Sequence, residues 1–302
     1  MNQGAAMGAA LQAVRNGLES VAATVRAEGV PVPVLQGKLL RPLVAYAALP
    51  TTARGRTDDR FWAGALAIQM VHEASLLHDD IIDAADTRRG VPTVATERGV
   101  AAALVSGDHL LTAAYRVAAR VRSPRFLEAF IHAVERTVAG EIRQQRGVGR
   151  HLSMREYRAA IEGKSGELFG AAVVLASAWG DRDDGPGADA GRRVGSLYQM
   201  VDDAVDYCPT ASVGKPALQD YGHRKYTFVL EAVGLTGFAL EPDEVVVRLF
   251  DPARGNGSER VLAALEAEQA EARSGFPDDD GMMAAVLGGW VSMAREAFER
   301  QR

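Results

Sequence analysis

The feature that most constrains the fold is a long apolar segment, residues 61–83, which ends in three aspartates. Apolar side chains such as Phe61 and Leu66 recur within this segment at helical spacing. The periodicity predicts one long helix that is mostly buried. Thr57 and Asp58 are both candidate N-cap residues for its start, and we expect the helix to end near Asp86.

The rest of the chain also favours helices over strands. Aromatic residues make up only 6% of the sequence, and no alternation of apolar and polar residues typical of strands occurs. The connections rich in glycine and proline are too short to be interdomain linkers. The predicted fold class is therefore all-α, with residues 1–302 forming a single domain of packed helices. The other expected helices span residues 4–28, 38–49, 95–120, 124–147, 153–179, 188–208, 225–236, 242–250, 257–273 and 280–300.

The composition excludes several classes of function. The 34 Lys and Arg residues and 39 Asp and Glu residues give a formal net charge of −5. No general attraction to nucleic acid or to anionic membranes is therefore expected. No window approaches the roughly 20 apolar residues that span a bilayer, and no signal peptide is recognisable. Cys208 is the single cysteine, which excludes a disulfide within the chain and favours the cytoplasm as the location.

Two acidic motifs of the form D-D-x-x-D, at residues 79–83 and 202–206, carry the chemical information. Each stands at the end of an apolar segment that is expected to be helical. On a helix, the first and last aspartates of such a motif share one face, and the middle aspartate lies about 100° round. We call these motifs the first triplet and the second triplet; their members are Asp79, Asp80 and Asp83, and Asp202, Asp203 and Asp206.

Such clusters are unfavourable unless cations accompany them. Carboxylates four residues apart repel each other, and the C-terminal end of a helix disfavours negative charge. Several oxygen ligands without histidine or cysteine are typical of Mg²⁺, which often shares its coordination shell with substrate phosphates. A solvated helix end is the alternative for one triplet alone, but two identical triplets favour a site. A third cluster, Asp278–Asp280, follows no apolar helix and is interpreted as a solvated loop and helix start.

At these motifs the sequence resembles the trans-type isoprenyl diphosphate synthases of the polyprenyl synthetase family, from about residue 37 to about residue 230. Members carry two aspartate-rich motifs, and the first is followed by an Arg-Arg-Gly that matches residues 88–90 here. The second is preceded by an aromatic residue and glutamine, which match Tyr198 and Gln199. The resemblance implies a helical bundle around a central cavity, with the two triplets facing each other.

The resemblance also assigns roles to individual residues. All six aspartates and Lys164 are implied to be catalytic, and Mg²⁺ is implied to be held by Asp79, Asp83 and Asp202. The residues implied to bind the diphosphate of isopentenyl diphosphate are Lys38, Arg41, His72 and Arg89. The residues implied to bind the allylic diphosphate are Arg88, Lys164, Ser165, Gln199, Lys215 and Lys225.

Each of these residues has a plainer interpretation when taken alone. Lys215 and Lys225 would be surface residues, and His72 would be a core histidine. Their shared order along the chain favours the binding roles. Lys38 and Arg41 are three residues apart and are expected to share one face of a first helical turn. Glu141 and Gln144 also match a family pattern and are interpreted as supporting or packing residues.

The implied reaction is an electrophilic alkylation assisted by three Mg²⁺ ions. The allylic diphosphate leaves, and the double bond of isopentenyl diphosphate attacks the allylic cation. Relatives that make short products often carry an aromatic residue at the positions of Ala74 and Ser75. Because both residues are small here, we expect a linear product longer than fifteen carbons, geranylgeranyl or longer. The alternative is that Ala74 is only a small packing residue.

Two other functions stay open. A class I terpene cyclase shares the fold, but it would not need the second diphosphate site that the basic residues imply. A regulatory subunit of a heteromeric synthase commonly lacks the aspartates, whereas all six are present here. The resemblance further implies a homodimer.

Overall fold

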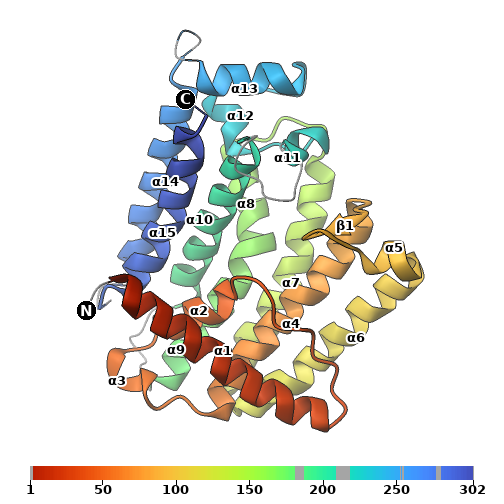
Figure 1. Ribbon diagram of the computed structural model, residues 1–302, viewed down its shortest axis with the longest axis vertical. Helices are drawn as coiled ribbons and strands as arrows, with labels where there is room; N and C mark the ends of the chain where they lie inside the picture. Colours follow the sequence, from red (N-terminus) through yellow and green to blue (C-terminus); the bar gives the residue numbers. More distant parts are fainter. Residues whose placement is uncertain are drawn as a thin grey trace.

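The computed structural model describes residues 3–180, 187–208, 218–251, 253, 255–276 and 280–301. The predicted all-α fold class is confirmed, because helices pack around a shared core throughout this part of the chain (Figure 1). At the centre lies α9 (Glu167–Trp179), which contacts α2 (Leu40–Ala47), α4 (Asp59–Ile82), α7 (Pro124–Gly147) and α10 (Ala188–Asp206).

The remaining helices surround this group. In Figure 1, α14 and α15 lie along one side, and α6 lies along the other side against α4. The bounds are α1 (Gln3–Ala27), α3 (Thr51–Arg54), α5 (Val94–Arg98), α6 (Val100–Ala118), α8 (Met154–Ile161), α11 (Gln219–Gly222), α12 (Phe228–Ala232), α13 (Pro242–Phe250), α14 (Gly257–Ser274) and α15 (Met282–Glu299).

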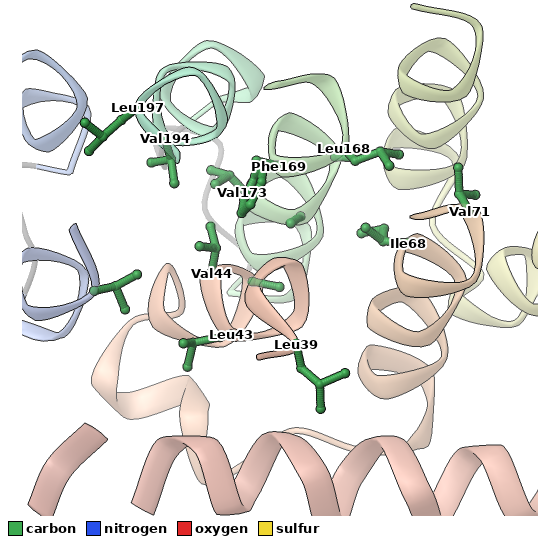
Figure 2. Close-up of a cluster of buried hydrophobic side chains, with 14 of the residues drawn as sticks. Leu39, Leu43, Val44, Ile68, Val71, Leu168, Phe169, Val173, Val194 and Leu197 are labelled. Carbon is green, nitrogen blue, oxygen red and sulfur yellow. The ribbon is translucent and has the colours of Figure 1, made fainter. Parts of the chain in front are cut away.

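The hydrophobic core is formed where α2, α4, α9 and α10 meet (Figure 2). Val44 of α2, Ile68 of α4, Phe169 and Val173 of α9 and Val194 of α10 are all fully buried there. Burying an aliphatic or aromatic side chain of this size contributes about 1.5–3 kcal/mol. This cluster therefore fixes the relative positions of the helices that carry the two triplets.

The start of α4 is capped by Asp58, one of the two candidate caps, and the helix ends earlier than predicted. The Asp58 side chain accepts a hydrogen bond from the backbone N–H of Arg60 at 2.7 Å. The helix ends at Ile82 rather than near Asp86, because Ala84 adopts a left-handed conformation with φ of 48°. The chain turns away at that point.

A two-stranded hairpin follows α4, where no strand was predicted. Its strands are β1 (Thr87–Arg88) and β2 (Val91–Pro92), which pair antiparallel. Arg89 and Gly90 between them both have positive φ, 53° and 79°, as a type I′ turn requires. Strands of two residues are too short to show an alternating pattern, so they could not be predicted from the sequence.

Three of the predicted helices are interrupted. The segment 95–120 divides into α5 and α6 at Gly99, whose φ is 87°, and ends in a 3₁₀ turn, Ala119–Val121. The segment 153–179 divides into α8 and α9 around a turn of π-helix, Glu162–Gly166, which we call the π turn. The segment 225–236 holds only the short α12. Within the described residues, no helix is both long enough and apolar enough to cross a membrane.

Candidate active site

The two triplets lie at the C-terminal ends of α4 and α10. Both helices end toward the same side of the bundle, where β1 and α11 also lie (Figure 1). The predicted division within each triplet agrees with the observed burial. Asp80 and Asp203, the middle members, are 5% and 4% exposed, whereas Asp79, Asp83 and Asp206 are half-buried and Asp202 is exposed.

Asp80 is held by the hairpin. The Nε of Arg88 donates a hydrogen bond to Oδ1 of Asp80 at 2.6 Å. The pair is largely buried, so both charges are better compensated by each other than by solvent. The turn at Arg89 and Gly90 positions strand β1 so that Arg88 lies near the end of α4.

Asp79 shares a lysine with a residue of α7. The Nζ of Lys164, in the π turn, lies 3.5 Å from Oδ1 of Asp79 and 2.6 Å from Oε2 of Glu141. Lys164 also donates a hydrogen bond to Oε1 of Gln144 at 2.9 Å. Burial alone would lower the pKa of Lys164, but Asp79 and Glu141 outweigh it and raise the pKa. The lysine is therefore firmly charged.

Asp83 forms an ion pair with Lys225, which lies just before α12. The Nζ of Lys225 donates to both carboxylate oxygens of Asp83, at 3.0 Å and 3.2 Å. The backbone N–H of Lys225 in turn donates to the carbonyl oxygen of Asp220. Each aspartate of the first triplet thus has its own basic partner.

The middle aspartate of the second triplet is fixed by a chain of hydrogen bonds. Tyr157 of α8 donates its hydroxyl to Oδ2 of Asp203 at 2.7 Å, and the amide of Gln199 donates to Oδ1 at 2.7 Å. The hydroxyl of Ser165 then donates to Oε1 of Gln199 at 2.5 Å. Sequence analysis predicted Ser165 and Gln199 as site residues, and this chain joins them to the second triplet.

The outer aspartates of the second triplet differ. Asp206 accepts hydrogen bonds from the backbone N–H groups of Gln219 and Asp220, at 3.2 Å and 3.0 Å. Asp202 is exposed. Among the side chains that the structure describes, none forms a hydrogen bond or ion pair with Asp202. Asp202 is thus the aspartate most available to a cation.

Burial, and after it neighbouring carboxylates, raise the pKa values of several aspartates in the site. The pKa of Asp206 is raised to about 7, first by burial and then by Asp220. Burial, and after it Asp220, also raises the pKa of Asp203 well above its usual value. The pKa of Asp79 is raised mainly by burial, against the opposing effect of Lys164. Burial thus disfavours the charged form of these carboxylates, and a nearby cation would favour it.

Asp220 is a site residue that the sequence analysis missed. Burial raises its pKa, and Asp202 and Asp83 add to the increase, whereas Lys225 opposes it. Asp220 therefore interacts electrostatically with both triplets. In the sequence, Asp220 is a single aspartate in a predicted loop with no motif around it. Only the folded chain brings it close to both triplets. Tyr157 was also missed, because a tyrosine in a helix has no pattern that marks it.

Arg41 lies on the other side of the site. It is buried, and its guanidinium stacks over the ring of Phe169, with 4.9 Å from Cζ to the ring centroid. Burial lowers its pKa to about 10, against the effect of Tyr198 and two carboxylates. It stays charged at neutral pH.

The expectation that Lys38 and Arg41 share a face of one helical turn is wrong. The helix α2 begins at Leu40, and Leu39 adopts a left-handed conformation with φ of 47°. Pro42 is tolerated only in the first turn of a helix, so the helix cannot begin much earlier. Lys38 is exposed, and its Nζ contacts Sδ of Met293 at 3.6 Å.

His72 and Arg89 complete this basic group. The pKa of His72 is lowered well below its usual value by burial, then by Arg41, Arg89 and Arg88. The guanidinium of Arg89 lies beside Gly37, because a Cβ added at Gly37 would be 3.3 Å from Nη2 of Arg89. The structure thus brings the predicted residues near one another, apart from the outward-facing Lys38.

The two positions predicted to control product length lie on α4, one turn before the first triplet. Ala74 is 2% exposed and belongs to the hydrophobic core. Ser75 is half-buried, and its hydroxyl donates to the carbonyl oxygen of His72 at 2.8 Å. Both side chains are small, and their role in product length stays a prediction.

Some predicted residues lie outside the described part of the chain. Lys215 is one of them, as are Asp278 and Asp279 of the third acidic cluster. The last member of that cluster, Asp280, accepts hydrogen bonds from Arg54, at 2.5 Å, and from the backbone N–H of Met282. Asp280 is thus bound at the start of α15 rather than simply solvated.

The donor chemistry of the site fits Mg²⁺. The groups that converge are carboxylates, the oxygen ligands that Mg²⁺ prefers, and burial raises the pKa values of Asp79 and Asp206. In the described residues, no three acidic or histidine side chains are already clustered as a metal-binding group. Instead, the aspartates of the first triplet are paired with Lys164, Arg88 and Lys225. Metal binding would therefore exchange these partners.

Comparisons with known proteins agree with the geometry. The octaprenyl diphosphate synthase of Escherichia coli (strain K12) is 30% identical over 240 residues, which are 78% of this chain and 72% of that protein. The octaprenyl diphosphate synthase of Haemophilus influenzae is 32% identical over 199 residues, 64% of this chain. The match spans only 60% of the length of this second relative.

Solved structures share the fold over nearly the whole chain. A polyprenyl synthase from Caulobacter crescentus has a TM-score of 0.72 and 25% identity, covering 99% of this chain and 95% of that one. A decaprenyl diphosphate synthase from Rhodobacter capsulatus has a TM-score of 0.78 and 23% identity, covering 98% and 99%. A family model described as polyprenyl synthetase matches residues 31–235. Because this match covers more than half of the chain, the chain is a prenyltransferase that belongs to the polyprenyl synthetase family.

Proposed function

We propose that this protein condenses isopentenyl diphosphate with an allylic diphosphate to give a linear polyprenyl diphosphate. One observation carries the proposal: every aspartate of the first triplet has a basic partner, and the second triplet lies in the same charged site. A site with so many opposite charges is suited to a ligand that brings both anions and cations with it. A diphosphate accompanied by divalent metal ions is such a ligand.

Mg²⁺ would be held by Asp79, Asp83 and Asp202, three ions in all, and when bound it would stabilise the negative charge of the departing diphosphate. The Caulobacter relative was crystallised with calcium and isoprenyl diphosphate, which supports a divalent ion at this kind of site. Asp80 and Asp203 act indirectly, because each is already held by protein partners. They keep the ends of α4 and α10 in place.

The allylic diphosphate would bind among the cations that now neutralise the first triplet. These are Arg88, Lys164 and Lys225, with Lys215 from outside the described residues, and hydrogen bonds would come from Ser165 and Gln199. As the allylic C1–O bond breaks, the electron pair leaves with the diphosphate, and these charges stabilise it. Their catalytic value arises because they are fixed before the charge develops.

Isopentenyl diphosphate would bind at Arg41, His72 and Arg89, with Lys38 reaching in from the surface. His72 is neutral in the free protein because burial and three arginines lower its pKa, so its N–H can donate to a phosphate oxygen. The double bond of isopentenyl diphosphate then forms the new bond to allylic C1. A proton leaves C2 for the departing diphosphate, and the apolar core helices exclude water from the cation.

The product is proposed to be longer than fifteen carbons. Ala74 and Ser75 lack bulk next to the first triplet, and relatives include enzymes named octaprenyl and nonaprenyl diphosphate synthase. A relative named geranylgeranyl diphosphate synthase marks the shorter limit of this range. Location in the cytoplasm stays a prediction from the single cysteine.

A homodimer is also proposed. Large apolar side chains are exposed on α6 and α7, and Ile131, Val138 and Ile142 of α7 share one helix face. Exposed apolar patches of this kind mark interaction surfaces. Light scattering should give twice the chain mass, and Ile142→Glu should give the monomer. A wild-type protein that is a monomer at micromolar concentration would contradict this.

The experiment that tests the reaction supplies isopentenyl diphosphate and Mg²⁺ with each allylic primer of ten, fifteen and twenty carbons, followed by mass spectrometry. Chain elongation by five-carbon steps is the expected result. A hydrocarbon or alcohol formed from the allylic diphosphate alone would instead indicate a terpene cyclase. Activity that appears only when a homologous subunit is added would indicate a regulatory subunit.

A further inference from the structure

The π turn carries two residues of the proposed allylic site. Five residues, Glu162–Gly166, form it between α8 and α9, and the backbone N–H of Glu167 donates to the carbonyl oxygen of Glu162. This is the i→i+5 bond that defines a π-helix, a form that is rare and often found at functional sites. Lys164 and Ser165 lie inside the turn. Something in the fold must hold it against relaxation to the more favourable α-helix.

Arg192 of α10 contacts both ends of the π turn. Its Nε lies 3.8 Å from Oε1 of Glu162, and its Nη1 lies 3.5 Å from Oε2 of Glu167. Arg192 also pairs with Asp189 on its own helix. One planar guanidinium thus spans two carboxylates that are five residues apart, and we call this arrangement the Arg192 clamp.

The Arg192 clamp is specific to the π conformation. In an α-helix, residues five apart are separated by about 140° around the axis, so their side chains point away from each other. In a π turn the i→i+5 bond closes about one full turn, so Glu162 and Glu167 come to the same side. Arg192 can contact both of them only in that state. Its ion pairs therefore favour the π turn over the α-helix.

One end of the clamp is buried. The side chain of Glu167 is 4% exposed, and its other oxygen lies 3.6 Å from Nε of Arg136 on α7. A buried carboxylate that loses a partner costs much more than a surface one. Rotating Glu167 away from Arg192 would therefore be opposed from α7 as well as from α10.

Lys164 and Ser165 of the π turn contact other residues of the proposed allylic site. Lys164 reaches Glu141 and Gln144, and Ser165 reaches Gln199. Relaxation to an α-helix would shift the register by one residue, which rotates one part of the helix by about 100° relative to the other. Lys164 and Ser165 could not then both keep these contacts.

We propose that Arg192 is a positioning residue that holds the π turn and thereby places Lys164 and Ser165 against the allylic diphosphate. The inference rests on the proposed function for the role of those two residues. Arg192 itself touches no substrate. Its effect is transmitted through the backbone between Glu162 and Glu167.

The test compares Arg192→Gln with Arg192→Lys and with a matched control on the next residue. The control is Arg193→Gln, because Arg193 also forms an ion pair with a glutamate, Glu271, at 3.4 Å, but away from the π turn. For Arg192→Gln we expect kcat/KM for the allylic substrate to fall by about tenfold. We expect KM for isopentenyl diphosphate to change by less than about twofold. Arg192→Lys should recover most of the loss, and Arg193→Gln should change neither value.

Hydrogen–deuterium exchange gives a second readout that needs no activity. Peptides spanning Glu162–Glu167 should exchange faster in Arg192→Gln than in the wild type, and Arg193→Gln should leave them unchanged. Unaltered exchange together with unaltered kcat/KM in folded Arg192→Gln would overturn the proposal. Equal losses in Arg192→Gln and Arg193→Gln would also overturn it, because they would indicate a general effect on stability. If the wild type elongates no primer, the proposed function fails, and the exchange data still decide whether Arg192 holds the π turn.

Discussion

The ammonium group of Lys225 lies 3.0 Å from Oδ1 of Asp83, and this pair joins the segment before α12 to the end of α4. In the proposed reaction, Lys225 binds the allylic diphosphate and Asp83 binds a metal ion. The two residues therefore neutralise each other until their ligands arrive. Binding requires that both partners be exchanged.

The exchange predicts opposite effects of one substitution. Lys225→Met should lower kcat/KM for the allylic substrate by about ten- to a hundredfold, because one phosphate contact is lost. The same variant should bind Mg²⁺ more tightly in the absence of substrate, because Asp83 loses its competing cation. Calorimetric titration with Mg²⁺ measures the second effect, with Arg224→Met, a neighbour that lies over Phe238, as the control. Weaker or equal Mg²⁺ binding in Lys225→Met would refute the exchange.

Loss of an outer aspartate should abolish turnover without unfolding the protein. Asp202→Ala and Asp79→Ala should each lower kcat by about a hundredfold or more, because each removes a proposed metal ligand. Asp202 is exposed, so its replacement should leave the melting temperature within about 2 °C of the wild type. Steady-state kinetics and calorimetry measure the two effects. Near-normal turnover in either variant is the result that contradicts the assigned role.

The metal-free protein should be more stable at pH 6 than at pH 8. The pKa of Asp206 is raised to about 7 in the folded protein, mainly by burial and then by Asp220, whereas an unfolded aspartate has a pKa of about 3.9. The folded state therefore holds the proton more tightly. Its contribution to stability is complete below about pH 4 and is lost as the pH rises through about 7.

Replacing Asp220 should weaken this dependence. Asp220→Asn removes the second-largest cause of the raised pKa of Asp206, so the melting temperature in EDTA should rise at pH 8 and change less at pH 6. Asp243→Asn, at an exposed position on α13, serves as the control. The same pH profile in Asp220→Asn and in the wild type would show that Asp220 does not act on the second triplet.

Bulk added before the first triplet should shorten the product. Ser75→Phe should shift the product distribution by one or more five-carbon units, because it adds a ring to a half-buried position one turn before the first triplet. Ala74→Phe should do the same, but with a lower melting temperature, because Ala74 is 2% exposed and an inserted ring overpacks the core. Mass spectrometry of the products measures the shift. An unchanged product spectrum in Ser75→Phe would reject this model of length control.

The long helices and the triplets were accessible from the sequence because their signals are local. The apolar period of residues 61–83 and the i, i+4 spacing of Asp79 and Asp83 depend only on helix geometry. The same geometry placed Asp80 and Asp203 on a different face from the outer aspartates, and the structure shows that this face is buried.

Other features depend on tertiary contacts and left no local pattern. The π turn is held from a different helix by Arg192, and Asp220 reaches the triplets only when the bundle forms. The start of α2 was misplaced because the left-handed Leu39 was not anticipated. Residues whose role depends on contacts between different helices are thus the ones that a single sequence does not reveal.

The type I′ turn sends two consecutive arginines in different directions. Arg88 binds Asp80 at the end of α4, and Arg89 lies beside Gly37 at the start of the α2 segment. Neighbouring Cα atoms are only about 3.8 Å apart. A single peptide unit therefore fixes the spacing between the proposed binding sites for the two diphosphates. Inserting or deleting one residue between Thr87 and Pro92 would misalign the allylic diphosphate and isopentenyl diphosphate together. No compensating change within either binding site could restore the spacing between them.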